Sequence, residues 1–170
     1  AEPDVLLIQE TKLSDADAPE MPMRMLGYEM AHHGEGRWNG VAILSREPAV
    51  ATQVGLPGQE HAGARLLGAQ VGGLEFTTVY CPNGKHTGHD DFPAKLRWFE
   101  SLAAHLEATA KPDRAAVLCG DFNVVPAAID SYDEESLHGS IFHTDAERAH
   151  LQRLLAAGYV DVFRALHPET

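Results

Sequence analysis

The chain has 170 residues, of which 44% are hydrophobic, and its formal net charge is −12 with the ten histidines counted as neutral. This length and apolar content exclude a disordered chain and fit one folded domain with a sizeable core. The sequence contains no apolar run of about eighteen residues, so we expect no membrane-spanning segment. The acidic total argues against sequence-independent coating of DNA, although a local basic groove is compatible with it.

The chain begins Ala1-Glu2-Pro3-Asp4 and runs directly into an apolar segment, without an initiator methionine or a charged leader. We therefore expect a chain truncated at its N-terminus and no visible signal peptide. Cys81 and Cys119 are too few for a disulfide framework or a zinc cluster. Because each adjoins an apolar run, we expect both to be buried, reduced thiols, which suits a cytoplasmic protein.

Apolar runs predict strands at residues 5–9, 41–44, 65–71, 75–80 and 115–119. The third and fourth strands flank Gly72-Gly73, a turn pair that predicts a β-hairpin. Polar residues follow the first strand at Glu10 and the last strand at Gly120-Asp121. The sequence shows no internal repeat, low-complexity tract or linker.

Two helices are predicted from their first residues and their apolar spacing. Asp91 can cap one of them, with Pro93 in its first turn. Thr144 forms a capping box with Glu147 at the start of the other, and Gly158 ends it. We expect their apolar stripes in the core, namely Leu96, Phe99, Leu102 and Leu106, and Leu151, Leu154 and Leu155. Hairpins with intervening helices predict an α/β domain whose mixed sheets are covered by helices.

Polar side chains stand at the ends of two predicted strands, where ligands bind in α/β sheets. Glu10 follows the first strand, and Gly120 permits a close backbone approach before Asp121. In an extended segment Asp121 and Asn123 would face one site while Phe122 anchors the loop. Taken alone, Glu10 is more often a turn former or a helix cap, and residues 120–123 fit a turn and a site equally well.

These side chains suit hydrolysis of a phosphodiester with the help of a hard cation. Mg²⁺ takes oxygen ligands, usually one or two carboxylates with substrate phosphate, and Glu10 fits as such a ligand. Asp121 can orient and deprotonate water, and the amide of Asn123 can donate to a phosphoryl oxygen. Tyr80 ends a strand before the Asn83-Gly84 turn, and its hydroxyl can donate to the phosphate or the leaving oxygen. Taken alone, a rim tyrosine before an ordinary turn is the commoner reading.

In this order the motifs resemble the exonuclease III branch of the endonuclease/exonuclease/phosphatase superfamily. The segments that carry the resemblance are QETK at 9–12, NGVAILSR at 39–46, YCPNG at 80–84, FPAK at 92–95, GDFN at 120–123 and DVFR at 161–164. Each motif alone is weak, but the set in register along essentially the whole chain is specific.

The resemblance implies an α/β fold, a four-layer sandwich of two mixed β-sheets flanked by helices (DNase I-like). It also implies one truncated domain over residues 1–170, and an enzyme of base excision repair that removes nucleotides from 3′ ends and cleaves beside abasic sites in double-stranded DNA. The cofactor is expected to be Mg²⁺, with Mn²⁺ as the alternative, and the protein is expected to be a cytoplasmic monomer that does not bind membranes.

The resemblance also assigns roles by position. Glu10 takes the place of the metal-binding glutamate, and Tyr80 that of the active-site tyrosine that contacts phosphate. Asp121 corresponds to the aspartate that activates water or handles the leaving-group proton, and Asn123 to the asparagine that supports the transition state. Asp121 and Asn123 are also second-metal ligands in some descriptions of the family. The candidate DNA contacts are Arg65, Asn83 and Lys85.

The sequence departs from the family at both ends. The opening strand with its asparagine is absent, as are the closing arginine-isoleucine-aspartate and serine-aspartate-histidine segments. We therefore expect the 170 residues alone to be inactive and marginally folded. His86 and His89 suggest a zinc pair only weakly, because no further ligand motif accompanies them.

Two other functions are considered. One is a superfamily phosphoesterase that acts on a phospholipid or an inositol phosphate, and the other is a non-catalytic DNA-binding relative. The segments 80–84 and 92–95 favour a nuclease over the first. Intact Glu10, Asp121 and Asn123 argue against the second, because a protein that only binds has no need of a metal carboxylate.

Overall fold

The computed structural model of the protein describes residues 2–110 and 114–169. They form two compact units, which we call the sheet unit and the helical unit. The sheet unit comprises Ala1–Cys81 and Ala110–Phe122, and the helical unit comprises Pro82–Thr109 and Asn123–Thr170. Within the described residues, no helix has the length and apolar character needed to cross a membrane.

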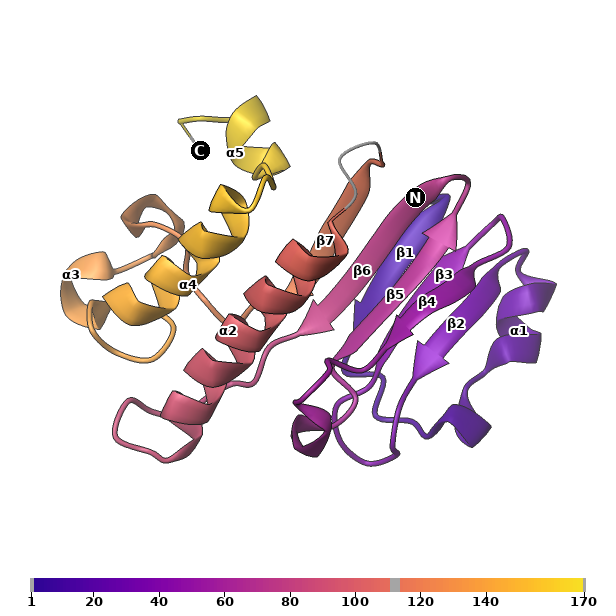
Figure 1. Ribbon diagram of the computed structural model, residues 1–170, viewed down its shortest axis with the longest axis horizontal. Coiled ribbons are helices and arrows are strands. Elements are labelled where there is room, and N and C mark those ends of the chain that lie inside the picture. The colour runs from indigo at the N-terminus through magenta and orange to yellow at the C-terminus, as the bar shows by residue number, and fades with distance from the viewer. Residues whose placement is uncertain (1, 111–113, 170) are drawn as a thin grey trace. The chain divides into compact units, whose positions relative to one another are not determined.

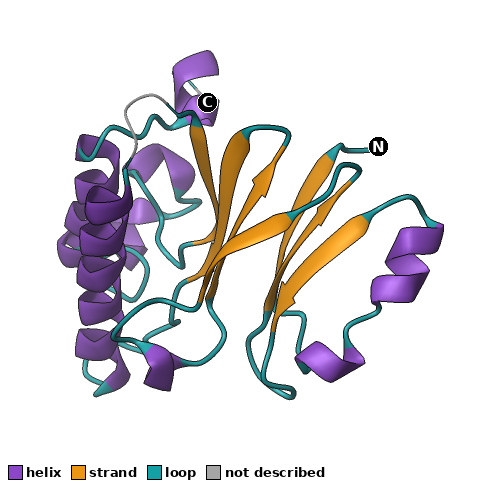
Figure 2. Ribbon diagram, turned by 45° about the vertical axis from the view of Figure 1, so that its right-hand side comes forward, coloured by secondary structure: helices purple, strands orange, loops and turns teal. Residues whose placement is uncertain are grey.

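The sheet unit holds two β-sheets that face each other (Figure 2). The first has the order β1-β3-β2 and is antiparallel, with β1 at Val5–Gln9, β2 at Glu29–His33 and β3 at Val41–Ser45. The second has the order β4-β5-β6-β7, with β4 at Val50–Val54, β5 at Leu66–Val71, β6 at Leu74–Tyr80 and β7 at Ala116–Asp121. Its strands are antiparallel except for β7, which runs parallel to β6.

The core of the sheet unit lies between the two sheets. Val41 and Ile43 of β3 meet Leu67 and Ala69 of β5, and all four side chains are fully buried. Their spacing of two residues places them on one face of each strand, as strand geometry requires. Burial of each large apolar side chain contributes about 1.5–3 kcal/mol, so this contact holds the sheets together. Helix α1 (Glu20–Met25) lies on the face of the first sheet that is turned away from the second (Figure 2).

The helical unit is built from four α-helices within the described residues. They are α2 (Asp91–Thr109), α3 (Glu134–Leu137), α4 (Asp145–Ala156) and α5 (Val162–Leu166). The rings of Phe99 in α2 and His150 in α4 are stacked with centroids 5.9 Å apart, and these are the two long helices of Figure 1. Short 3₁₀ turns occur at Asp15–Asp17, Glu60–Ala62 and Ala128–Asp130.

The predicted strands and helices are confirmed, with shifts of one or two residues at their ends. Gly72 and Gly73 have φ values of 55° and 84°, and positive φ at both positions is what a tight hairpin turn needs. The Thr144 capping box is present. The sequence did not predict β2, β4 or the short helices, because neither EMAHH of β2 nor VATQV of β4 contains a continuous apolar run.

Two expectations about burial are wrong. Cys81 is buried but Cys119 is exposed, and both are free thiols. Cys119 lies on β7, which pairs only with β6 among the described residues, and the strand's apolar Val117 is 39% exposed. The helical stripes differ as well. Lys95 and Glu147 are fully buried, whereas Leu96, Leu151 and Leu155 are only half-buried.

We predict that Gly120→Ala is strongly destabilising. Gly120 pairs with Val79, and a Cβ there would lie 2.0 Å from the Val79 carbonyl oxygen, a backbone atom that cannot move without disturbing the β6–β7 pairing. Urea denaturation should show a loss of about 3 kcal/mol or more in the free energy of unfolding. The control is Gly73→Ala, where nothing lies within 4 Å of the added Cβ and only the positive φ is unfavourable, at about 1–2 kcal/mol. Equal losses in both variants would contradict the steric argument.

A second prediction concerns acid stability. Arg148 of α4 donates from Nη1 and Nη2 to the two oxygens of Glu134 in α3, at 2.7 and 2.8 Å, and this pair holds the pKa of Glu134 down at about 2. A carboxylate whose pKa is lowered by folding stabilises the protein above its unfolded pKa of about 4.3, and this contribution is lost as the pH falls. Glu134→Gln should therefore flatten the fall in unfolding free energy between about pH 4.5 and 2. Glu135→Gln, the exposed neighbour, should leave that fall in place.

Candidate active site

The loop after β1 fixes the position of Glu10. Glu10 and Lys12 have φ values of 56° and 55°, in the left-handed region. The backbone amides of Thr11 and Lys12 donate to the carbonyl oxygens of Gly40 and Asn39 at 3.2 and 2.9 Å. A Cβ at Gly40 would lie 2.1 Å from the Thr11 hydroxyl, so only glycine fits there. The turn before β3 therefore supports the turn that carries Glu10.

A buried histidine reinforces this loop. His32 of β2 has a side chain that is only 2% exposed, and it contacts Asp15 through Nδ1 at 2.8 Å and Thr11 through Nε2 at 2.8 Å. Asp15 also accepts a hydrogen bond from the amide of Gly34 at 2.7 Å. Sequence reasoning missed this chain of contacts, because β2 was not recognised as a strand. The polar run of β2, with two adjacent histidines, offered no apolar alternation to reveal it.

Glu10 and Tyr80 are in direct contact. The Tyr80 hydroxyl donates to Glu10 Oε1 at 2.9 Å, and Lys12 Nζ lies 2.9 Å from Glu10 Oε2. The hydrogen bond from Lys12, followed by that from Tyr80, lowers the pKa of Glu10. Burial, followed by the hydrogen bond to Glu10, raises the pKa of Tyr80. The pair is therefore an ionised carboxylate beside a protonated phenol.

Arg65 holds Tyr80 in place. Its guanidinium carbon lies 4.8 Å from the centre of the Tyr80 ring. Nε donates to the Ala62 carbonyl at 2.8 Å, and Nη1 donates to the Tyr80 carbonyl at 3.1 Å. Burial lowers the pKa of Arg65, and the interactions with Tyr80 and Cys81, followed by the charge of Glu10, partly offset this effect. A planar cation stacked on the ring and bonded to the backbone restricts the tyrosine to one orientation.

Asp121 stands at the same end of the sheet unit. It is the last residue of β7 and pairs in register with Tyr80, and its carbonyl accepts a hydrogen bond from the Cys81 amide at 2.8 Å. Its charge also raises the pKa of Tyr80, after the contributions of burial and Glu10. The arrows of β1 and β6 point to this end of the sheet unit in Figure 1, and β1 also contacts β7. The structure thus gathers Glu10, Tyr80 and Asp121 at one end of the strands.

The other predicted site residues belong to the helical unit. Asn123 has a φ of 50°, so the extended geometry expected from Asp121 to Asn123 is wrong, since the strand ends at Asp121. The Asn83 side chain accepts a hydrogen bond from the Lys85 amide at 2.9 Å. The Lys85 ammonium lies 2.9 Å from Asp91. These contacts order the turn after β6 and the start of α2.

A model of the Endonuclease/Exonuclease/phosphatase family matches residues 1–165. The chain belongs to this family. Exodeoxyribonuclease III of Haemophilus influenzae is 32% identical over 179 residues, an alignment that covers 98% of this chain and 67% of that protein.

Solved structures of relatives have the same fold. An AP endonuclease from Archaeoglobus fulgidus matches with a TM-score of 0.95 at 33% identity, over 99% of this chain and 65% of that one. A 3′–5′ exonuclease from Neisseria meningitidis matches with a TM-score of 0.94 at 36% identity, over 98% of this chain and 66% of that one. The predicted DNase I-like fold class is confirmed, and the chain spans about two thirds of the length of these relatives.

The side chains at this end of the sheet unit can supply some of the ligands of a hard cation. Among residues 2–110 and 114–169, no three His, Cys, Asp or Glu side chains gather to hold a metal ion. Mg²⁺ commonly takes only one or two protein carboxylates and fills its remaining positions with water and phosphate. The ionised Glu10 offers such a carboxylate. His86 and His89 instead meet edge to face, with ring centroids 5.4 Å apart.

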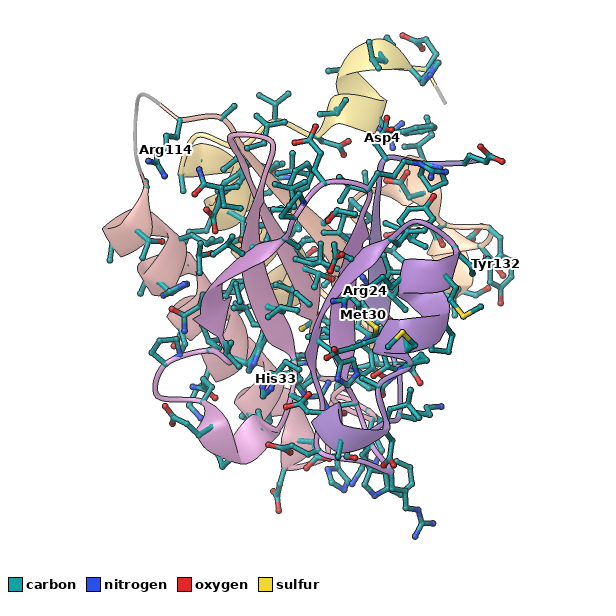
Figure 3. All side chains as sticks on the ribbon, turned by 90° about the vertical axis from the view of Figure 1, so that its right-hand side faces the viewer. Asp4, Arg24, Met30, His33, Arg114 and Tyr132 are labelled. Carbon is teal, nitrogen blue, oxygen red and sulfur yellow. The ribbon has the colours of Figure 1, made fainter. Side chains whose placement is uncertain are left out.

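We predict that the pKa of Glu10 rises when either of its partners is removed. Lys12→Met should raise it more than Tyr80→Phe, because Lys12 is the larger cause of the lowering. A titration that follows the Glu10 carboxyl carbon by NMR measures both changes. Arg24→Met is the control, since Arg24 pairs with Glu29 and belongs to α1, where Figure 3 labels it. A Glu10 pKa that is unchanged in both test variants would show that the pair does not form in solution.

Proposed function

We propose that the protein is a metal-dependent DNA phosphodiesterase that acts at 3′ ends and abasic sites in base excision repair. The observation that carries this proposal is the hydrogen bond of 2.9 Å between Tyr80 and Glu10, beside Asp121 at one edge of the sheet unit. Relatives of similar fold are named exodeoxyribonuclease III, AP endonuclease and 3′–5′ exonuclease.

The first part of the mechanism uses Glu10 and Tyr80. Glu10, kept ionised by Lys12 and Tyr80, would hold Mg²⁺, or Mn²⁺ in its place. When bound, the cation would neutralise charge on the phosphoryl oxygens and the leaving oxygen. Tyr80 keeps its proton, which it donates to Glu10 here, and it would turn this O–H to a phosphate oxygen once the cation takes the carboxylate. Arg65 keeps the phenol pointed at the site through the stacked contact.

The second part uses Asp121 and Asn123. Asp121 would orient and deprotonate the attacking water, and a second metal position on Asp121 and Asn123 is compatible with these residue types. The Asn123 amide would donate to the phosphoryl oxygen that gains charge in the transition state. Arg65, Asn83 and Lys85 would contact the DNA backbone. With a net charge of −12, these contacts have to be local.

A related activity is the second candidate. A 3′ phosphatase from Neisseria, solved with a product DNA hairpin, matches this chain with a TM-score of 0.94 at 35% identity. Removal of a terminal phosphate needs the same metal, the same activated water and the same phosphate donors. We therefore propose 3′-phosphate removal as a further reaction of the same site. A cytoplasmic location and a monomeric state are parts of the proposal that rest on the sequence alone.

The substrate class can be tested directly with the full-length gene product. Duplexes with an abasic site, a recessed 3′ end or a 3′ phosphate are compared with an inositol phosphate, with Mg²⁺, with Mn²⁺ and with a chelator. Cleavage of the DNA substrates alone, and only with a metal, is the expected result. Preference for the inositol phosphate would replace the proposal with a small-molecule phosphoesterase. DNA binding without cleavage would replace it with a binding protein.

We predict that Asp121→Asn lowers kcat on abasic duplex DNA by about 100- to 10,000-fold, as loss of a general base does. The Kd for DNA should change little, because the shape of the side chain is kept. Glu10→Gln should raise the Mg²⁺ concentration needed for half-maximal activity. Asp4→Asn is the matched control, since Asp4 precedes β1 at the end of the first sheet opposite to His33 of β2 (Figure 3). A loss of DNA affinity that explains the whole effect would make Asp121 a binding residue instead.

A further inference from the structure

The helical unit contains a fully buried ion pair that the proposed function does not use. Lys95 of α2 and Glu147 of α4 both have side chains with 0% exposure, and Lys95 Nζ lies 2.5 Å from Glu147 Oε1. Lysine and glutamate are almost never fully buried without a partner, because each charge loses its hydration. A buried pair is usually no more stabilising than two apolar residues of the same size. Its presence therefore needs another physical reason.

The ammonium of Lys95 is tied to two loops as well as to Glu147. Nζ donates to the carbonyl oxygen of Asn123 at 2.6 Å and to that of Asn83 at 3.3 Å. Together with Glu147, these acceptors use all three donors of the ammonium group. The ring of Phe142 lies 4.8 Å from Nζ on a further side. An isolated carbonyl of a turn could not bind this cation alone, but the two carbonyls and Glu147 together replace its water shell.

Glu147 is itself held rigidly. Its Oε2 accepts hydrogen bonds from the amide and the hydroxyl of Thr144, at 3.2 and 2.7 Å, in the capping box of α4. Its Oε1 accepts a hydrogen bond from the Phe142 amide at 3.1 Å in addition to that from Lys95. The carboxylate is therefore a fixed point at the start of α4, and it sets the position of the lysine.

The two carbonyls belong to places where the backbone turns sharply. Asn123 has a φ of 50°, and Gly84, which follows Asn83, has a φ of 84°. A Cβ at Gly84 would lie 3.0 Å from Lys95 Cδ, so the lysine stem packs directly beneath that turn. Asparagine adopts left-handed backbone more readily than most residues, but it also samples other conformations, so a surrounding contact is needed to fix this one. The hydrogen bond from Lys95 is such a contact.

We propose that Lys95, held by Glu147, is a positioning residue for the reaction. It fixes the backbone at Asn123 and Asn83, and thereby the direction in which their side chains meet the DNA phosphates. The inference rests on the proposed function, because it assumes that Asn123 supports the transition state. Misplacement of a catalytic group by about 1 Å can lower the rate about 100-fold. Correct positioning of Asn123 therefore gives a reason to keep a buried ion pair that adds little stability.

The test separates positioning from stability. Lys95→Met alone leaves Glu147 charged and buried, and should lower the Tm strongly. Lys95→Met combined with Glu147→Gln removes both charges and keeps a side-chain oxygen for the Thr144 capping box and the Phe142 amide, so it should recover part of that loss. The hydrogen bonds to the two loops stay absent. We expect the double variant of the full-length gene product to melt cooperatively yet to have a kcat on abasic duplex DNA about 10- to 100-fold below the parent.

A double-mutant cycle links the effect to Asn123. Asn123→Ala should lower kcat, and adding the Lys95→Met/Glu147→Gln change to it should lower kcat little further, because Lys95 then has no Asn123 side chain to position. Leu102→Ala is the matched control on the same helix. Leu102 is fully buried, so its truncation lowers the Tm, but kcat should stay at the parental value in folded protein. If the double variant does not fold, Lys95→Gln is assayed at low temperature on its folded fraction, with the same expectation.

The possible failures are distinguishable. If the Lys95 variants keep parental kcat while Glu10→Gln and Asn123→Ala lose activity, the positioning role is wrong and the proposed function stands. If the Lys95 change and Asn123→Ala lower kcat by independent, multiplying factors, the lysine does not act through Asn123. If Glu10→Gln and Asn123→Ala both keep parental activity, the proposed function itself is wrong.

Discussion

A hydrogen bond between the Tyr80 hydroxyl and the Glu10 carboxylate joins two strand ends that lie 70 residues apart in the sequence. It can form only because β1 belongs to one sheet and β6 to the other, and because the two sheets pack through Val41, Ile43 and their neighbours. The apolar contact between the sheets therefore sets the distance between the two polar groups. The chemistry of the site therefore depends on the packing of the core. Arg65 then orients the Tyr80 ring, and Lys12 lowers the pKa of Glu10.

Backbone strain occurs at proposed site residues in both units. Among the described residues, the non-glycine positions with positive φ include Glu10, Lys85 and Asn123, three residues that the sequence had already marked as functional. Such conformations cost of order 1–3 kcal/mol each and persist only where neighbours enforce them. The enforcing contacts are visible for two of them. The Asn39-Gly40 turn holds the loop of Glu10, and Lys95 holds the carbonyl of Asn123.

A buried polar side chain holds a loop in each of the two units. In the sheet unit, His32 links Asp15 to Thr11, next to Glu10. In the helical unit, Lys95 links Glu147 to the turns at Asn83 and Asn123. Each of these side chains gives up hydration to hold a loop that carries a proposed site residue. A hydrophobic side chain could fill the same space, but it could not select one orientation of a peptide group.

The sequence by itself determined the strands at residues 5–9, 41–44 and 65–80, the capped helices, the family, and the identity of Glu10, Tyr80 and Asp121 as candidate residues. These features are encoded locally, by apolar runs, turn glycines and short motifs. Only the tertiary structure decided that Tyr80 meets Glu10, that Cys119 is exposed on an edge strand and that Lys95 is buried against Glu147. Those outcomes depend on which distant segments become neighbours. A lysine within a helical stripe looks like a solvent-exposed residue until its partner, 52 residues away, is brought beside it.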